Sequence, residues 1–310
     1  MKQGQLINGY TIVSRPTNAN AGKCVWAFAT KAGRHYFIKE YLDPKLPRTD
    51  SMGTPADKRR RYRECQRFEQ RHRRMASLLR ADQLHAGNLV LVRDFFAAGT
   101  RYYKVTDRIE AVDVVPHRLP EWQQLVILRT LGDSLRLLHS HGIVHGDLKP
   151  ENVLLSRPPR SDLCTAKLID FDDAYPVGDP PAPDELGGNP IFAAPEWLSY
   201  LHGEAGQSAM GQAVDMFAFG LLMHVYLYGA GPGHDDRYDS PASAVLDEAP
   251  LCWDARVPDR LGRLMAALTR RDPAVRPDIA SVMNALDDPA LLRGDTPPRS
   301  RVRVNLTGGR

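Results

Sequence analysis

The stretch His145-Gly-Asp-Leu-Lys-Pro-Glu-Asn152 decides the expected fold and chemistry of this 310-residue chain. Asp147 is suited to accept or orient the proton of an attacking hydroxyl, and Lys149 can reach a phosphate as a point charge. Asn152 offers an amide oxygen, a ligand type that Mg²⁺ accepts. Since phosphoryl transfer needs these parts, the stretch predicts a catalytic loop with Asp147 and Lys149 as catalytic residues and Asn152 as a metal ligand.

A second acidic stretch, Leu168-Ile-Asp-Phe-Asp172, follows a short apolar run. A carboxylate at the end of a strand is a natural ligand for a hard cation. Asp170 is therefore predicted to hold Mg²⁺, or alternatively Mn²⁺, against the β- and γ-phosphates. Asp172 adds a carboxylate that would bind a second Mg²⁺ or face solvent. We favour solvent, because a lone carboxylate beside a site is often solvated.

Further motifs follow in order, and together the set resembles the eukaryotic-like, bacterial-type Ser/Thr protein kinase family. His145–Asn152 is similar to the family's H-R-D-x-K-x-x-N loop, and Phe171 stands where D-F-G has its phenylalanine. The other matches are Ala194-Pro-Glu196, Asp215-Met-Phe-Ala-Phe-Gly220 and Arg276. The resemblance pairs Arg276 with Glu196 and gives His145, Phe171 and Asp215 structural roles.

The resemblance also implies an activity and an architecture. It implies transfer of the γ-phosphoryl group of ATP to a protein hydroxyl, and Lys149 favours Ser/Thr over Tyr. The implied fold is bilobal and α+β, with a β-rich N-lobe containing one long helix and a helical C-lobe. ATP and Mg²⁺ would bind between the lobes.

The order of the expected elements agrees with two lobes, because strands precede helices and the change falls near residue 107. We expect strands at 10–13, 24–30, 35–41, 89–96, 102–106, 153–155 and 167–169. We expect helices at 57–80, 121–141, 194–202, 212–229, 258–269 and 277–286. The chain is divided into an N-lobe (1–107), a C-lobe (108–289) and a basic tail (290–310) expected to be disordered.

The nucleotide site is expected around Phe37-Ile-Lys39, which resembles the family's V-A-I-K strand. The resemblance makes Lys39 the residue that contacts the α- and β-phosphates, with a helix glutamate as its partner. We favour Glu64, because Phe68 one turn on would then pack inward against Phe171. Glu69 is the alternative. Phe37 replaces a small residue that would lie against the adenine ring.

The glycine-rich loop of the family is degenerate in this chain. Aligning Val25 with the family valine puts Asn18, Asn20 and Lys23 at the glycine positions, with Gly22 nearby. Asn tolerates positive φ better than most residues, so a tight turn can survive. The ATP-binding candidates besides Lys39 and Glu64 are Val25, Asn20, Gly22, Lys23, Thr106 and Asp107, the last two at the gatekeeper and hinge positions.

The segment 173–193 contains no Ser or Thr, and Tyr175 is its one phosphorylatable residue. Gly146 stands where the resemblance places an arginine that often pairs with a phosphate on this segment. Asn189 replaces a threonine of many Ser/Thr kinases. The first two absences agree with each other, so we expect activation without phosphorylation of Ser or Thr in this segment.

Bulk composition excludes several other classes of protein. A net charge of +4 is small for this length and does not by itself indicate nucleic-acid binding. Four scattered cysteines argue against a zinc site or a disulfide framework. No apolar run is long enough to span a membrane and no signal peptide is evident, so we expect a cytoplasmic protein without a membrane partner. The excess of Arg over Lys suggests a bacterial source.

Two other functions remain open on the sequence. A small-molecule kinase of the aminoglycoside/choline phosphotransferase type would explain Gly146 and Asp172. A pseudokinase, meaning a nucleotide-binding scaffold, would explain the degenerate glycine loop. The basic helix region 58–80 could also bind an acidic partner or nucleic acid, although such charge runs are usually solvated faces.

Overall fold

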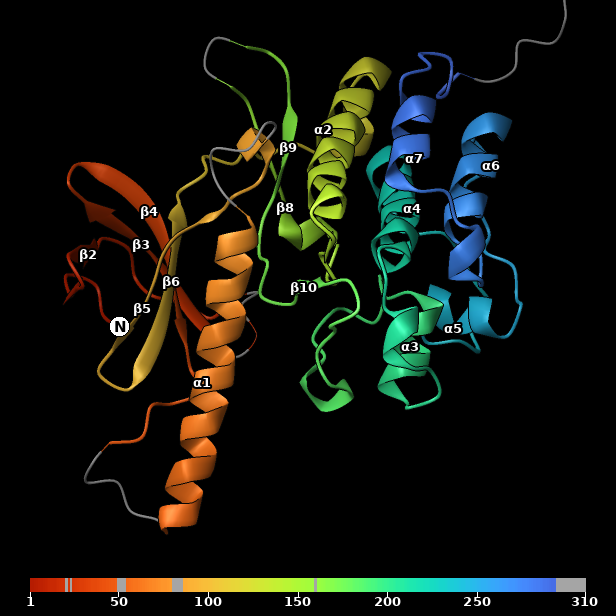
Figure 1. Cartoon of the computed structure of the whole chain (residues 1–310). Coiled ribbons are helices and arrows are strands. Elements are labelled where there is room, and N and C mark those ends of the chain that lie inside the picture. Colours follow the sequence, from red (N-terminus) through yellow and green to blue (C-terminus); the bar gives the residue numbers. More distant parts are fainter. Residues whose placement is uncertain (20–21, 23, 49–53, 80–85, 159–160, 294–310) are drawn as a thin grey trace, which may run out of the picture.

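The computed structural model describes residues 1–19, 22, 24–48, 54–79, 86–158 and 161–293. Figure 1 shows an antiparallel sheet, one long helix beside it, and a mainly helical body on the far side of that helix in this view. This arrangement confirms the predicted α+β architecture of two lobes. The predicted tail falls outside the described residues from position 294 onward.

The N-lobe is built on a six-stranded sheet in the order β1-β2-β3-β4-β6-β5. Its strands are β1 (Leu6–Ile7), β2 (Tyr10–Ile12), β3 (Cys24–Lys31), β4 (Arg34–Tyr41), β5 (Val92–Ala98) and β6 (Arg101–Asp107). β3 and β4 form a hairpin whose register pairs Trp26 with Lys39 and Phe28 with Phe37. Directly opposed residues share one face of a sheet, so these four side chains lie on the same side.

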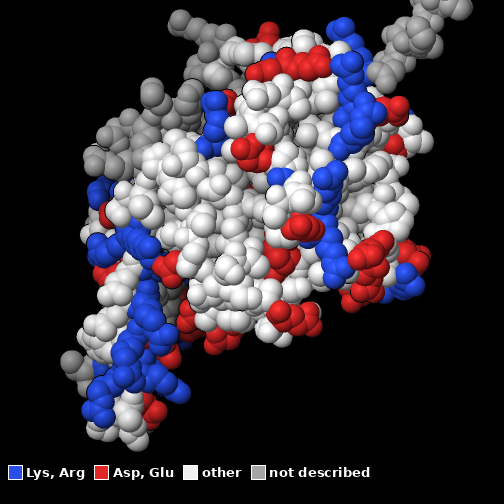
Figure 2. Space-filling model, turned by 45° about the vertical axis from the view of Figure 1, so that its right-hand side comes forward, with Lys and Arg blue, Asp and Glu red and all other residues white. Residues whose placement is uncertain are grey.

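The long helix α1 (Pro55–Leu78) begins at a capping box. The Thr54 hydroxyl accepts a hydrogen bond from the Asp57 amide, and the Asp57 carboxylate accepts one from the Thr54 amide. These bonds satisfy donors that a helix start leaves open. Cys65 and Met75 are its buried residues. The first turns project beyond the body (Figure 1), and Lys and Arg gather there in Figure 2.

The C-lobe packs its helices around α2 (Glu121–Ser140) and α4 (Ala213–Tyr228). Five apolar residues of α2 recur at helical spacing and are 0% exposed: Ile127, Leu128, Leu131, Leu135 and Leu138. Helix α4 is buried almost all round. Its other helices are α3 (Pro195–Leu201), α5 (Pro241–Leu246), α6 (Asp259–Leu268) and α7 (Ile279–Leu286). Its short strands are β7 (Ile143–Val144), β8 (Val153–Ser156), β9 (Thr165–Leu168) and β10 (Tyr175–Pro176).

Most predicted elements are confirmed, with ends that differ by up to three residues. The sequence prediction omitted α5 and the two-residue strands β1, β7 and β10, which are too short to show a periodic pattern. Within the described ranges, no helix combines the length and apolar character required to cross a membrane.

Candidate active site

The catalytic stretch forms a tight loop between β7 and β8, and it ends in a single turn of 3-10 helix at Pro150–Asn152. Lys149 Nζ lies 2.6 Å from Asp147 Oδ2, and Asn152 Nδ2 donates to the same oxygen at 2.8 Å. The other carboxylate oxygen, Asp147 Oδ1, is buried and has no hydrogen-bond partner among the described residues. One acceptor of the central carboxylate is therefore free.

The buried carboxylate of Asp215 is hydrogen-bonded to the backbone of this loop. It accepts hydrogen bonds from the backbone amides of His145 at 2.8 Å and Gly146 at 3.0 Å, and it lies 3.0 Å from His139 Nε2. Burial alone would raise the pKa of Asp215, but the His139 contact and the other donors outweigh burial and lower it. Asp215 therefore acts as an ionised anchor for the loop backbone.

The predicted metal-binding stretch Asp170-Phe171-Asp172, called the metal motif below, lies beside the catalytic loop. His145 Nε2 is 3.2 Å from the Ile169 carbonyl oxygen, and the Phe171 ring packs edge-on against His145 at 5.4 Å. Asp170 has a φ of +60°, a left-handed conformation that is rare for a residue other than glycine. Such conformations persist where the surrounding structure holds them, often at functional sites.

Lys39 reaches this motif from the sheet and makes two ion pairs. Its Nζ lies 2.8 Å from Asp170 Oδ2 and 2.7 Å from Asp172 Oδ2. A second lysine, Lys104 on β6, also contacts both carboxylates, at 3.0 Å for Asp170 Oδ1. Sequence reasoning missed Lys104, although a lysine amid the apolar and aromatic residues of an inner strand was a visible signal. The expectation that Asp172 faces solvent was wrong, because Asp172 is enclosed by these lysines.

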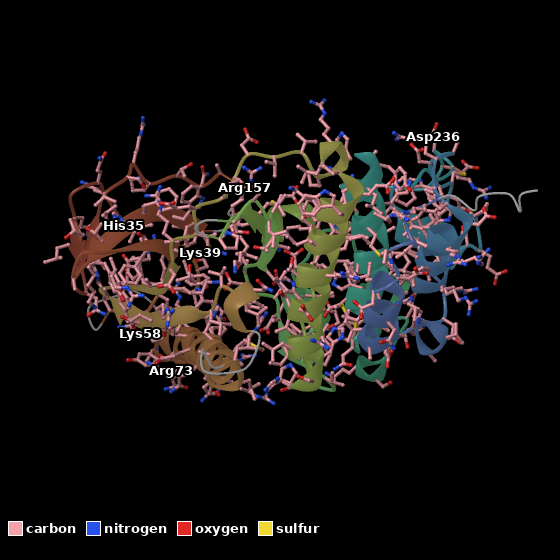
Figure 3. The ribbon with its side chains drawn as sticks, turned by 90° about the horizontal axis from the view of Figure 1, so that it is seen from above. His35, Lys39, Lys58, Arg73, Arg157 and Asp236 are labelled. Atoms are coloured by element: carbon pink, nitrogen blue, oxygen red, sulfur yellow. The ribbon has the colours of Figure 1, made fainter. Side chains whose placement is uncertain are left out.

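A cavity of about 350 Å³ lies between the sheet and the C-lobe. Its walls include the aromatic side chains of Trp26, Phe28 and Phe37, and Trp26 stacks on Phe37 at 5.3 Å. The predicted residues Lys39, Thr106, Asp107, Asn152 and Asp170 also line it. In Figure 3, Lys39 lies between the sheet and the strands of the C-lobe, whereas Lys58 and Arg73 lie along α1.

The placement of Val25 in the nucleotide site is a correction to the prediction. Val25 pairs with Glu40, so it lies on the face of the sheet opposite to Lys39. Trp26 takes the expected place in the cavity wall. A shift of one residue along a strand transfers every side chain to the other face, which is why the alignment failed here.

The assignment of Glu64 as the partner of Lys39 was also wrong. Glu64 is half-exposed, and its carboxylate lies 4.0 Å from Arg60 on the same helix. Phe68 packs with Tyr41 and Tyr102 and does not belong to the cluster of Phe171, whereas Met75 does. The helix therefore meets the metal motif further along than the prediction assumed.

The alternative, Glu69, does not reach Lys39 either. It pairs with Arg73 at 2.8 Å. Two other α1 side chains approach Asp172: His72 Nδ1 lies 4.0 Å from its Oδ1, and Arg71 donates to its backbone carbonyl.

The predicted phosphate loop is described only in part. Asn20 and Lys23 lie outside the described residues, and Gly22 has a φ of +53° with open space around its Cα. The Trp26 indole N–H donates to the Ala19 carbonyl at 2.9 Å. This bond ties the loop to the cavity wall.

The donor set suits Mg²⁺. Asn152 uses its amide N–H groups on Asp147, so its amide oxygen is the atom it can turn to a cation. Asp170 lines the same cavity and supplies a carboxylate. Across the described ranges, no group of three or more His, Cys, Asp or Glu could hold a metal on its own. Mg²⁺ commonly binds through one or two protein oxygens plus phosphate oxygens, so these two residues would hold it together with a nucleotide.

The segment 173–190 lies directly on the catalytic loop. Gly146 has a φ of +78°, and a Cβ there would come within 2.8 Å of the Asp173 carbonyl oxygen and 3.0 Å of the Tyr175 ring. Tyr175 pairs with Val144 and is 2% exposed. Asn189 Oδ1 accepts a hydrogen bond from the Ile191 amide at 2.9 Å, and among the described residues no bond joins Asn189 to Asp147.

Carboxylates of this segment face arginines on one side of α1. The three pairs are Arg67 with Glu185 at 3.8 Å, Arg71 with Asp173 at 3.9 Å, and Arg74 with Asp179. The three arginines recur at spacings of four and three residues, which places them on one helix face. The segment is thus connected to the N-lobe by ion pairs.

Comparisons with known proteins agree with this geometry. A Xenopus laevis protein named serine/threonine-protein kinase ULK3 is 32% identical over 160 residues, covering 51% of this chain and 32% of the relative. Serine/threonine-protein kinases of Drosophila persimilis (GL21140) and Drosophila melanogaster (CG17528) are 30% identical over 195 and 194 residues, covering 61% of this chain and 23% and 24% of theirs. The chain therefore spans between about a quarter and a third of the length of these relatives.

These relatives are eukaryotic, so the bacterial-type assignment stays a prediction. A family model described as the protein kinase domain matches residues 48–286, which is well over half of the chain. The chain therefore belongs to the protein kinase domain family.

Proposed function

We propose that this chain is an ATP-dependent protein kinase that phosphorylates Ser or Thr hydroxyls of a protein substrate. The observation that carries the proposal is the free oxygen Asp147 Oδ1, which is buried and has no hydrogen-bond partner in the described part of the chain. Its twin oxygen is held by Lys149 and Asn152. A buried acceptor is costly to leave unpaired, which favours a hydroxyl donor as its occupant.

Each of these residues has a proposed role in the phosphoryl transfer. The substrate hydroxyl donates to Asp147 Oδ1, and its oxygen forms a bond to the γ-phosphorus as the bond to the β,γ-bridging oxygen breaks. The proton passes to Asp147, while Lys149 and Lys39 stabilise charge on the phosphates. Mg²⁺, held by Asn152 and Asp170, would supply charge neutralisation on the phosphate oxygens.

Activation without phosphorylation of the segment 173–193 is part of the proposal. Tyr175, its one hydroxyl side chain, is buried, and burial followed by the charges of Asp215 and Glu196 raises the pKa of its hydroxyl. The space beside Gly146 is filled by Asp173 and Tyr175. A phosphate on such a segment can order it by pairing with an arginine. Here carboxylates of the segment already pair with arginines of α1, so a phosphate is not needed for this link.

The finer assignments belong to the same proposal. Thr106 and Asp107 would border the adenine, and Gly22 would lie near the phosphates. The protein acts in the cytoplasm on a protein substrate, with Mg²⁺ as the metal and Mn²⁺ as an alternative. An acidic protein or nucleic acid is a further partner proposed for the basic region 58–80, supported by the projecting cations in Figure 2.

The test incubates the purified chain with labelled Mg²⁺–ATP and either generic protein or small amines. We expect label on Ser or Thr of the protein, and Asp147→Asn should lower kcat by about 10²–10⁴-fold while nucleotide binding is kept. Asp247→Asn, an exposed carboxylate far along the chain, is the matched control.

Three results would contradict the proposal. Label on the amines alone favours a small-molecule kinase. Nucleotide binding without any transfer favours a pseudokinase. Full activity in Asp147→Asn removes Asp147 from the mechanism.

A further inference from the structure

Two lysines share one buried face of the N-lobe sheet. Lys39 on β4 and Lys104 on β6 are directly opposed in the strand register, and they are 7% and 5% exposed. Like charges directly opposite each other on a sheet are destabilising, and a buried ammonium group needs a partner. The surroundings must therefore compensate both charges.

Asp170 and Asp172 provide this compensation. Each carboxylate contacts both lysines, and the Tyr41 hydroxyl donates a further hydrogen bond to Asp172 Oδ1 at 2.7 Å. Burial alone would raise the pKa of Asp172, but Lys104 and Lys39 outweigh burial and hold it well below its usual range. Two ammonium and two carboxylate groups leave the cluster without formal net charge.

Helix α1 adds no carboxylate to this cluster. The α1 side that faces Asp172 presents the His72 ring, and Arg71 donates to the Asp172 backbone carbonyl. Burial lowers the pKa of His72 to about 4, so its ring is neutral near pH 7. In protein kinases the strand lysine is held by a helix glutamate. Here the anionic partners of Lys39 come from the metal motif itself.

We propose that Asp172 and Lys104 are positioning residues for Lys39 and Asp170. Asp172 holds the Lys39 ammonium at the cavity, as a helix glutamate would. Lys104 supplies a second ammonium group, so that each of the two carboxylates contacts two lysines. The inference rests on the proposed function, since it assigns how that site keeps its nucleotide-binding lysine in place.

The proposal predicts a specific dependence on charge balance. Removing Lys104 alone leaves two carboxylates facing one lysine, and the surplus negative charge repels nucleotide phosphates. Removing the Asp172 carboxylate as well leaves one lysine, Lys39, with one carboxylate, Asp170, and so restores the charge balance. If the two residues only filled space, the losses of binding free energy in the two single variants would add in the double variant.

The experiment compares Lys104→Met, Lys104→Arg, Asp172→Asn and the double variant Lys104→Met/Asp172→Asn in the full chain. The readouts are the Kd of a non-hydrolysable ATP analogue with EDTA and with Mg²⁺, the KM for ATP, kcat, and Tm. Matched controls are Lys167→Met, whose ammonium bonds to Asn88, and Asp94→Asn, whose carboxylate accepts from Tyr10.

We expect Lys104→Met to weaken analogue binding about tenfold or more, and Lys104→Arg to stay within about threefold of the wild type. The double variant should bind more tightly than Lys104→Met, and Asp172→Asn should raise the KM for ATP more than it lowers kcat. Both controls should bind as the wild type does.

Losses that add in the double variant would overturn the inference, as would equal losses in Lys104→Met and Lys104→Arg. A lower Tm with unchanged Kd would also overturn it. Should Asp172→Asn fail to fold, the comparison of Lys104→Met with Lys104→Arg still decides whether charge matters. A wild type that binds the analogue but transfers no phosphoryl group contradicts the proposed function alone, whereas one that binds no nucleotide contradicts both.

Discussion

Arg276 and Glu196 form a buried bidentate ion pair between the C-terminal part of the C-lobe and α3. Nη1 lies 2.6 Å from Oε1 and Nη2 lies 2.8 Å from Oε2, and the two side chains are 0% and 5% exposed. The guanidinium also donates to the backbone carbonyls of Arg270, Ala213 and Arg271. This pair joins segments eighty positions apart in the sequence.

We therefore predict that Arg276→Met lowers the free energy of unfolding by about 3–5 kcal/mol, because it leaves a buried carboxylate unpaired. Arg271→Met is the control: Arg271 pairs with Glu248 at the surface, and its loss should cost about 0–1 kcal/mol. Urea unfolding measures both. Equal effects of the two substitutions would contradict the importance of the buried pair.

The register of β3 predicts that Trp26, rather than Val25, contacts the nucleotide. Trp26→Ala should raise the KM for ATP about tenfold, since an aromatic ring stacked on a base contributes about 1–3 kcal/mol. Val25→Ala, on the opposite face, should change it by less than about twofold. Steady-state kinetics decide, and a larger effect at Val25 would refute the register.

We predict that the stability of the metal-free and nucleotide-free chain depends on pH because His72 is buried. Burial lowers its folded-state pKa to about 4, with Lys104, Arg71 and Lys39 also lowering it and Asp172 opposing them. The unfolded chain binds a proton at this residue below pH 6.5, while the folded chain does not until about pH 4. Stability should therefore fall as the pH drops through this window, by on the order of 3 kcal/mol.

The His72→Phe variant keeps an aromatic ring and removes the titrating group. Its stability should lack this part of the slope when unfolding is followed by urea at several pH values. His202→Gln, an exposed site, should keep the slope of the wild type. An unchanged slope in His72→Phe would show that other groups cause the dependence.

Activity should not depend on phosphate in the segment 173–193. Treatment with a phosphatase, and Tyr175→Phe, should each leave kcat/KM within about twofold of the untreated wild type, because the segment is linked to α1 through carboxylates. Activity that vanishes on phosphatase treatment and returns after incubation with Mg²⁺–ATP would contradict this.

The parts of this site that are local in sequence could be predicted from it. Asp147, Lys149 and Asn152 lie within one loop, so their spacing alone places them together. Long-range relations could not be read in this way. The face of β3 that meets the cavity depends on a register of one residue, and the helix partner of Lys39 depends on where along its length α1 meets the metal motif.

The replacement of a helix glutamate by Asp172 illustrates the same limit. The extra carboxylate was visible in the sequence, but its meaning depended on Lys104, which β6 brings opposite Lys39. Strand pairing between residues 65 positions apart creates that relation, and no local pattern reports it.

Gly146 also bears on how this protein could change over evolution. Any side chain at this position would have to adopt a left-handed backbone and displace the Asp173 carbonyl or the Tyr175 ring. A single mutation to arginine is thus a poor first step toward control by a phosphate. The neighbouring segment would have to change first, so the order in which mutations occur would decide whether an arginine can be accommodated here.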